Sequence, residues 1–175
     1  MEQVSSSQEA LIEAFRQAQR HVASSVHLIT TGSGDARSGM TATAVCSLSF
    51  DPLSILVCVN RHASIFESLD RGGRFAVNIL SESDEEIATM FGTSKLKALR
   101  FKSGDWRQMG GSPILLSAVA SVACESLSAM DVGTHRVVAG RIVDVNVNTN
   151  SRPLLYHHGG YCGTGALESS VACAA

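Results

Sequence analysis

The chain has 175 residues and a mass of 18.4 kDa, which is the size of one domain. Hydrophobic residues make up 45% of the chain and charged residues 17%, so the composition is globular and excludes disorder over most of its length. The formal net charge of −2 argues against a general binder of nucleic acids or anionic membranes, because phosphate contacts need clustered Lys and Arg.

Five cysteines are present, an odd number, and no two of them form a Cys-x-x-Cys pair. This spacing is not typical of a disulfide framework or a metal clip, so we expect a reduced, cytoplasmic protein. The first ten residues are polar and acidic, unlike a signal peptide. No apolar run approaches the ~20 residues that a membrane-spanning helix needs, so we expect no membrane segment.

The first predicted elements are a helix and a short strand. Residues 8–20 place Leu11 and Phe15 on one face of an amphipathic helix, and Ser7 is suited to be its N-cap. The β-branched run 26–31 predicts a strand that loop-forming residues end.

Strands continue through the middle of the chain. Residues 40–50 alternate apolar even positions with mostly small, hydroxylated odd positions, which predicts one strand ended by Asp51-Pro52. Residues 54–60 predict a strand buried on both faces. A short helix over 63–69 and a strand over 74–80 follow.

The second half begins with a helix over 84–91, for which Ser83 is suited as the N-cap. Residues 92–111 predict a looser segment that carries several basic residues and the only Trp. Further strands are predicted at 119–128, 135–148 and 154–156.

Strands outnumber helices in this prediction, and the helices are too few to cover a doubly wound sheet. The expected fold class is therefore mainly β with peripheral helices, and a β-barrel is favoured over an α/β sandwich. We expect one domain over 1–162 and a flexible carboxyl-terminal tail, rich in Gly, Ala and Ser, over 163–175.

Several common motifs are incomplete or missing. Gly32-Ser33-Gly34 follows a predicted strand, but Arg37 stands where a dinucleotide fingerprint needs its third Gly. No Gly-Lys-Ser/Thr triplet and no Gly-x-Ser-x-Gly elbow exist. Adjacent strand residues point to opposite faces, so His157 and His158 do not predict a shared metal site.

One stretch does predict a ligand site. Small and hydroxylated side chains between residues 39 and 49 leave backbone N–H and C=O groups accessible to a flat heteroaromatic ligand. Residues 60–64 run from a strand end into a predicted helix start, which can accept a phosphate; Ser64 offers a hydroxyl and Arg61 a positive charge. The alternative is that the alternating Thr and Ser form the solvent-exposed face of a strand.

An ordered set of motifs resembles the short-chain flavin reductases, the reductase components of two-component flavin-dependent monooxygenases such as those for 4-hydroxyphenylacetate and phenol. The set consists of Gly-Met-Thr-Ala-Thr-Ala-Val-Cys-Ser at 39–47, Leu-Val-Cys-Val-Asn-Arg at 56–61, Gly-Arg-Phe-Ala-Val-Asn-Ile-Leu at 73–80, Gly-Thr-His at 133–135, Pro-Leu-Leu-Tyr at 153–156 and Gly-Gly-Tyr at 159–161. The resemblance covers residues 12–162. It implies a split β-barrel of Greek-key type, a homodimer, and FMN or FAD bound near the subunit interface.

The resemblance also implies roles for individual residues. The segment that lines the isoalloxazine ring corresponds to Gly39, Met40, Thr41, Ala42, Thr43, Ala44 and Ser47. The turn that holds the ribityl phosphate corresponds to Asn60, Ala63 and Ser64, and a basic-aromatic element near the phosphate to Arg100, Phe101 and Lys102. The histidine beside the nicotinamide corresponds to His135, and the stretch that reaches the NAD(P)H site includes His157 and Tyr161.

The implied reaction is hydride transfer from NADH or NADPH to flavin, followed by release of reduced flavin to a partner monooxygenase. The protein then has to hold the two cofactors close together in the right orientation, which agrees with the lack of an acid–base pair in the sequence. Two alternatives stay open: a reductase of another acceptor, such as a corrinoid or a ferric complex, and a non-enzymatic flavin-binding or electron-transfer protein. The sequence does not distinguish FMN from FAD or NADH from NADPH.

Overall fold

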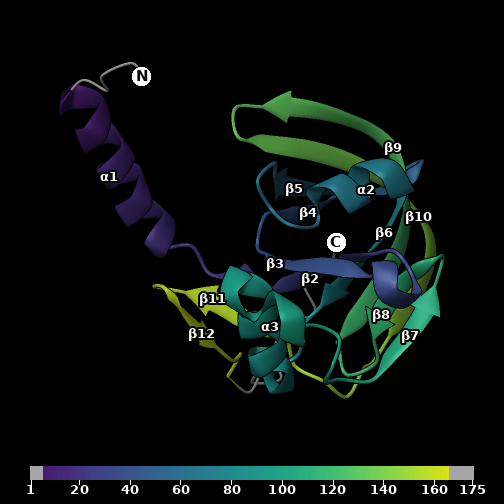
Figure 1. Ribbon diagram of the computed structural model, residues 1–175. Helices are drawn as coiled ribbons and strands as arrows, with labels where there is room; N and C mark the ends of the chain where they lie inside the picture. Colours follow the sequence, from purple (N-terminus) through teal and green to yellow (C-terminus); the bar gives the residue numbers. More distant parts are fainter. Residues whose placement is uncertain (1–5, 166–175) are drawn as a thin grey trace.

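Figure 1 shows the computed structural model, which describes residues 6–165. The α-helices are α1 (Ser6–Arg20), α2 (Phe66–Gly72) and α3 (Glu85–Gly92), and the 3-10 helices are η1 (Gly34–Ala36), η2 (Glu82–Asp84) and η3 (Ser94–Leu99). The strands are β1 (Ser24–Ser25), β2 (His27–Thr31), β3 (Ser38–Ala42), β4 (Val45–Phe50), β5 (Leu53–Asn60), β6 (Arg74–Ile79), β7 (Trp106–Met109), β8 (Ser112–Leu115), β9 (Ala120–Val132), β10 (His135–Val147), β11 (Leu155–His157) and β12 (Gly160–Cys162).

Seven strands form one antiparallel sheet in the order β3-β2-β6-β9-β10-β5-β4. The edge strands β3 and β4 are consecutive in the chain, and only Thr43 and Ala44 join them. A connection this short requires the sheet to curl until its two edges meet. The result is a barrel with a seam between β3 and β4, across which no strand pairing is formed.

Two apolar clusters hold the barrel and its covering helix. Ile29, Val57, Phe75 and Val122 belong to the cluster within the barrel. A second cluster, which includes Leu28 and Phe91, packs α3 against the sheet. Strand β2 is buried along its whole length because its alternating side chains contribute to both clusters.

A capping box fixes the start of the α3 region. The Ser81 backbone N–H and hydroxyl donate to Asp84 Oδ2 at 2.8 and 2.7 Å, and the Ser117 hydroxyl donates to Asp84 Oδ1 at 2.6 Å. The prediction of Ser83 as the N-cap is therefore wrong, and the cap is Ser81. The reason is that the 3-10 helix η2 precedes α3, so the helical segment starts nearer the amino terminus.

The mainly β class with peripheral helices is confirmed, and several element boundaries need correction. The single strand predicted over 40–50 is two strands, interrupted at Thr43 and Ala44 where the chain passes from one barrel edge to the other. The helix predicted over 63–69 is α2, which begins at Phe66 because turn hydrogen bonds occupy residues 60–66. The loose segment 92–111 contains η3 and β7, and β8 was not predicted.

Helix α1 forms as predicted, but none of its side chains is buried. It begins at Ser6, so Ser7 lies inside the helix and is not its N-cap. Figure 1 shows that α1 extends away from the barrel. None of the described helices is long and apolar enough to cross a membrane. Most of the predicted tail, residues 166–175, lies outside the described residues, as do residues 1–5 of the predicted domain.

Candidate functional site

A pocket of about 340 Å³ lies at the barrel seam. It is lined by Val26, Met40, Thr41, Ala42, Thr43, Ala44, Cys58, Asn60, Gly92, His135, Tyr156 and Tyr161. Eight of these residues are among those that the sequence predicted for a flavin and nicotinamide site. The pocket therefore brings together segments separated by more than a hundred residues in the chain.

The wall formed by residues 40–44 offers backbone groups. Strand β3 pairs only with β2, so its outer edge has N–H and C=O groups without a strand partner. The Thr41 hydroxyl donates to Ala88 O in α3 at 2.7 Å and is therefore engaged away from that edge. Thr43 and Ala44 are exposed and small. This donor and acceptor set fits the polar edge of a flavin ring.

His135 reaches the pocket from the opposite side of the seam. It is the first residue of β10, where it pairs with Asn60 of β5. Thr134 Oγ1 lies 2.9 Å from His135 Nδ1, so Nε2 is the ring nitrogen left available to a ligand. The Arg61 backbone N–H donates to Thr134 O at 2.9 Å and ties this turn to the end of β5.

An ion-pair network supports the same turn. The Arg136 guanidinium contacts both Asp131 and Asp70, and Arg61 Nη1 lies 3.8 Å from Asp131 Oδ2. Hydrogen bonds from Arg136 keep the pKa of Asp131 below its ordinary value. The network joins the β9–β10 hairpin to α2 and to the turn after β5, and Arg61 has this structural role outside the pocket.

Two tyrosines from the β11–β12 hairpin close one end of the pocket. The rings of Tyr156 and Tyr161 lie edge to face with centroids 5.5 Å apart. Burial raises the pKa of Tyr161, so its hydroxyl stays protonated and can donate a hydrogen bond at neutral pH. No carboxylate lines this pocket within the part of the chain that the structure describes.

The turn after β5 places a hydroxyl beside a cation, and no helix begins in it. Asn60 Oδ1 accepts a hydrogen bond from the His62 backbone N–H at 2.9 Å. The Ser64 hydroxyl accepts one from Arg100 Nη1 at 3.0 Å. Because α2 starts at Phe66, residues 60–64 do not run directly into a helix start as predicted, and the Ser64 hydroxyl lies beside Arg100 instead.

Arg100 occupies a central position among these elements. It donates to Gly39 O and Phe91 O, each at 2.9 Å, as well as to Ser64. Partial burial lowers its pKa, but an Arg side chain remains charged at neutral pH. Arg100 therefore brings a fixed positive charge to the end of β3 and holds α3 beside it.

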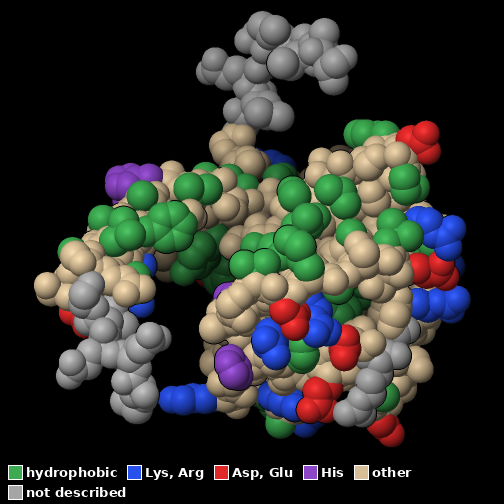
Figure 2. All heavy atoms as spheres, turned by 90° about the horizontal axis from the view of Figure 1, so that it is seen from above, with side chains coloured by type: hydrophobic (Ala, Val, Ile, Leu, Met, Phe, Trp, Pro, Cys, Tyr) green, Lys and Arg blue, Asp and Glu red, His purple; other side chains and the backbone are tan. Residues whose placement is uncertain are grey.

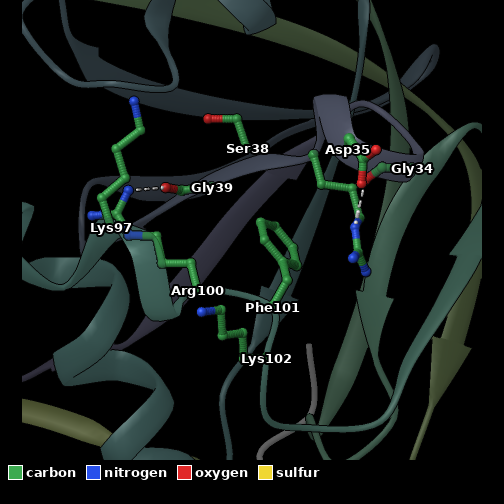
Figure 3. A pocket seen from close by; sticks show the side chains of 9 residues that line it. Gly34, Asp35, Ser38, Gly39, Lys97, Arg100, Phe101 and Lys102 are labelled. Atoms are coloured by element: carbon green, nitrogen blue, oxygen red, sulfur yellow. Dashed lines mark hydrogen bonds between the residues drawn. The ribbon is translucent and has the colours of Figure 1, made fainter.

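A second, basic pocket of about 270 Å³ begins where the seam pocket ends along β3. Figure 3 shows Lys97 beside the hydrogen bond from Arg100 to Gly39, with Gly34 and Asp35 on the opposite side and Phe101 between them. Four predicted residues, Gly39, Arg100, Phe101 and Lys102, line this pocket and not the one at the seam.

Some predicted residues lie outside both pockets. Ser47 lines a separate hollow beside His27, and Ala63 packs against the barrel core. The His157 ring contacts the His158 ring, with centroids 4.4 Å apart. Neither His157 nor Ser47 lines the seam pocket.

Sequence reasoning did not select several lining residues. Val26, Cys58, Gly92 and Tyr156 were not chosen for the seam pocket, nor were Arg37 and Lys97 for the basic one. Cys58 and Tyr156 stand within motifs quoted for the resemblance, which is a usable signal. The others reach the site only through the three-dimensional packing of loops and helix ends.

Comparison with known proteins gives a consistent result. Residues 19–165 match the family described as "Flavin reductase like domain". The chain belongs to this family. The FMN reductase (NADH) RutF of Pseudomonas syringae pv. syringae is 35% identical over 144 residues, which are 82% of this chain and 81% of that protein.

Solved structures of flavin reductase components share the fold. A nitrilotriacetate monooxygenase component B homologue from Mycobacterium thermoresistibile is 30% identical, with a TM-score of 0.85 over 94% of this chain and 93% of that one. The styrene monooxygenase flavin reductase of Pseudomonas putida S12 is 28% identical, with a TM-score of 0.77 over 86% and 97% of the two chains. The expected family and its split-barrel fold are therefore confirmed.

Proposed function

We propose that this flavin reductase-family chain oxidises NADH, reduces a free flavin such as FMN, and releases the reduced flavin to a partner oxygenase. The observation that carries the proposal is the seam pocket, in which the free backbone edge of β3 faces His135 of β10. The family, the relative named FMN reductase (NADH), and the neighbour that is a flavin reductase of styrene monooxygenase support it.

Different residues bind different parts of the flavin and the nicotinamide. Backbone groups of residues 40–44 hold the ring system, and Ser64 with Arg100 receives the phosphate end. His135, oriented by the hydroxyl of Thr134, positions the nicotinamide over the same pocket. The bound cofactors supply the hydride chemistry themselves. The chain needs only to hold the nicotinamide close to the flavin in the right orientation. The lack of a carboxylate among the described lining residues agrees with this role.

The exposure of the pocket favours a flavin that binds and dissociates in each catalytic cycle. In a single copy of the chain, Thr43, Ala44 and His135 are all exposed at its rim. A cofactor that stays bound needs most of its surface covered. We therefore infer that the flavin acts as a second substrate and not as a retained group, which distinguishes this proposal from a flavin carrier.

We also propose that the chain is a homodimer. Leu11 and Phe15 of α1 are 69% and 63% exposed, and Met130 and Val132 of the β9–β10 hairpin are 62% and 56% exposed. Figure 2 shows hydrophobic side chains gathered in patches on the face seen from above. Apolar patches of this kind are typical of interaction surfaces, and a second copy is the partner that the family resemblance implies. A cytoplasmic location stays a prediction.

Steady-state kinetics test the proposed reaction. Oxidation of NADH and of NADPH is measured with FMN, FAD and riboflavin offered in turn, and with no flavin added. We expect oxidation of NADH that depends on added flavin. A yellow protein that keeps its flavin through dialysis and oxidises neither nucleotide would instead be a carrier and would contradict the proposal.

A further inference from the structure

The end of the β9–β10 hairpin extends past the strands around it. Strand β6 pairs with β9 as far as Glu125, so among the described strands residues 126–132 have only β10 beside them. The pairing of β10 with β5 ends at His135 itself. Residues 126–135 are all exposed, and a Cβ added at Gly133 in the turn would meet no atom within 4 Å. Packing around the turn therefore does not fix its position, which depends on contacts at its base (Figure 1).

Arg136 is the first partly buried residue after this turn. It directly follows His135, and neighbouring side chains of a strand point to opposite faces. His135 accordingly lines the seam pocket, and Arg136 lines a small hollow of about 40 Å³ between the hairpin and α2. Arg136 therefore does not line the seam pocket, and it can affect a ligand there through the position of its neighbour.

The Arg136 guanidinium joins both strands of the hairpin to α2. Its Nε and Nη2 donate to the two carboxylate oxygens of Asp131, the opposite residue of β9, at 2.6 and 3.1 Å. Its Nη1 donates to Asp70 Oδ1 of α2. The guanidinium also lies 4.7 Å from the centroid of the Phe66 ring, the first residue of α2. A bidentate and stacked guanidinium has a fixed geometry, so these contacts define where the hairpin lies relative to α2.

Helix α2 is a firm attachment point for the hairpin. Leu69 of α2 is buried and belongs to the apolar cluster within the barrel, as does Ile65 directly before the helix. The helix also continues from the turn that carries Asn60 and Ser64. Because Asp131 lies 3.8 Å from Arg61 Nη1 as well, the hairpin is tied both to α2 and to the end of β5.

We propose that Arg136 is a positioning residue for the nicotinamide, because it holds the β9–β10 hairpin against α2 and thereby sets the position of His135 over the seam pocket. The inference rests on the proposed reductase function and adds to its site a residue that does not itself touch a ligand. Loss of this tie leaves the flavin wall at residues 40–44 in place and moves His135 away from it.

Variants on both sides of the tie test the assignment. Arg136→Ala removes the guanidinium, and Asp70→Asn removes its partner on α2 without changing the hairpin. We expect the KM for NADH to rise about fivefold and about threefold, respectively, the range for exposed ion pairs, with kcat and the FMN dissociation constant changed less than twofold. Hydrogen exchange measured by mass spectrometry should become faster over residues 126–135 in both variants and stay unchanged in the rest of the barrel.

Arg141→Ala is the matched control. Arg141 lies on the same strand, and its Nη2 donates to Glu125 Oε2 of β9 at 2.5 Å, where β9 is paired on both sides. We expect the wild-type KM and wild-type exchange for this variant. The double variant of Arg136→Ala and Asp70→Asn should be no worse than Arg136→Ala alone, because both changes break one tie.

Other results would contradict the assignment. Unchanged exchange over residues 126–135 would mean that Arg136 does not hold the hairpin, and faster exchange with an unchanged KM would mean that the hairpin's position does not govern use of NADH. Equal losses of NADH and FMN affinity, or a changed oligomeric state in light scattering, would give Arg136 a general structural role. A wild type without flavin-dependent NADH oxidation would contradict the proposed function, whereas an active wild type with unaffected variants contradicts only this assignment.

Discussion

At the scale of single residues, our proposal makes use of the nicotinamide depend on His135. It faces residues 40–44 across the seam pocket and is oriented by a 2.9 Å contact with Thr134. We expect His135→Ala to raise the KM for NADH about tenfold, the value of one well-placed hydrogen bond, and to change the FMN dissociation constant less than twofold. Steady-state kinetics and flavin titration measure the two quantities separately.

His62→Ala is the control for this variant, because His62 lies in the adjacent turn, is exposed and does not line the pocket. We expect wild-type kinetics for it. Equal losses of nucleotide and flavin affinity in His135→Ala would assign His135 a general structural role and would contradict its position beside the nicotinamide.

A second histidine, His27, predicts a pH dependence of stability. His27 is buried, and its Nδ1 has no hydrogen-bond partner among the described residues. Burial lowers its pKa below the usual 6.5. As the pH falls below 6.5, the unfolded chain binds a proton that the folded chain does not bind, so the free energy of unfolding decreases, by at most about 1.4 kcal/mol per pH unit for this one group.

We expect His27→Gln to show a smaller decrease in the free energy of unfolding between pH 7.5 and pH 5.5 than the wild type, measured by urea denaturation. His62→Gln removes an exposed imidazole and should follow the wild-type curve. Parallel curves for the wild type and His27→Gln would show that His27 titrates alike in the folded and unfolded chain.

At the scale of elements, the close approach of α3 to β3 requires a glycine at position 39. A Cβ there would lie 2.8 Å from Phe91 Cε1 and 3.0 Å from Ile29 O. We expect Gly39→Ala to lower the free energy of unfolding by about 1–3 kcal/mol, the usual cost of overpacking. It should also weaken FMN binding, because Arg100 is anchored on Gly39 O.

Gly160→Ala in β12 is the matched control, since the nearest atom to an added Cβ there is 4.0 Å away. Denaturation curves of the two variants and the wild type are compared under the same conditions. If both substitutions change stability equally, tight packing at Gly39 does not explain the need for glycine.

The helices and strands also show which features of the fold can be predicted from the sequence. Short apolar runs predicted β5, β6 and most of β9, and alternation predicted β10, because both patterns are local properties of the sequence. The interruption at Thr43 and Ala44 was not predicted, since the alternation continues through it. That interruption is imposed by closure of the barrel, which depends on the order of all seven strands.

The residues of the candidate site were likewise predicted only in part. Residues 40–44 are contiguous and, after Met40, small, and sequence reasoning selected them together with Asn60, His135 and Tyr161, all of which line the seam pocket. Arg37 and Lys97 were missed because each lies in a segment without a periodic pattern. Both line the basic pocket, Arg37 directly after η1 and Lys97 within η3, although sixty residues separate them in the sequence.

At the scale of the whole molecule, helix α1 buries none of its residues in a single copy of the chain. Its amphipathic sequence forms 15 helical residues, none of them buried, so folding of one copy leaves its apolar stripe in water. Isolated helices of this length are marginally stable without packing. A partner surface therefore explains why the helix is formed, and a second copy of the chain is the partner we propose.

The dimer is tested by placing a charge in the apolar stripe of α1. Phe15→Glu puts a carboxylate where the proposed interface is dry, at a cost of several kcal/mol unless it is paired. We expect light scattering to show a dimer for the wild type and a monomer for Phe15→Glu at the same protein concentration. Gln17→Glu adds the same charge on the polar face of α1 and should remain dimeric. A monomeric wild type, or a Phe15→Glu variant that stays dimeric, would exclude this stripe as the dimer contact.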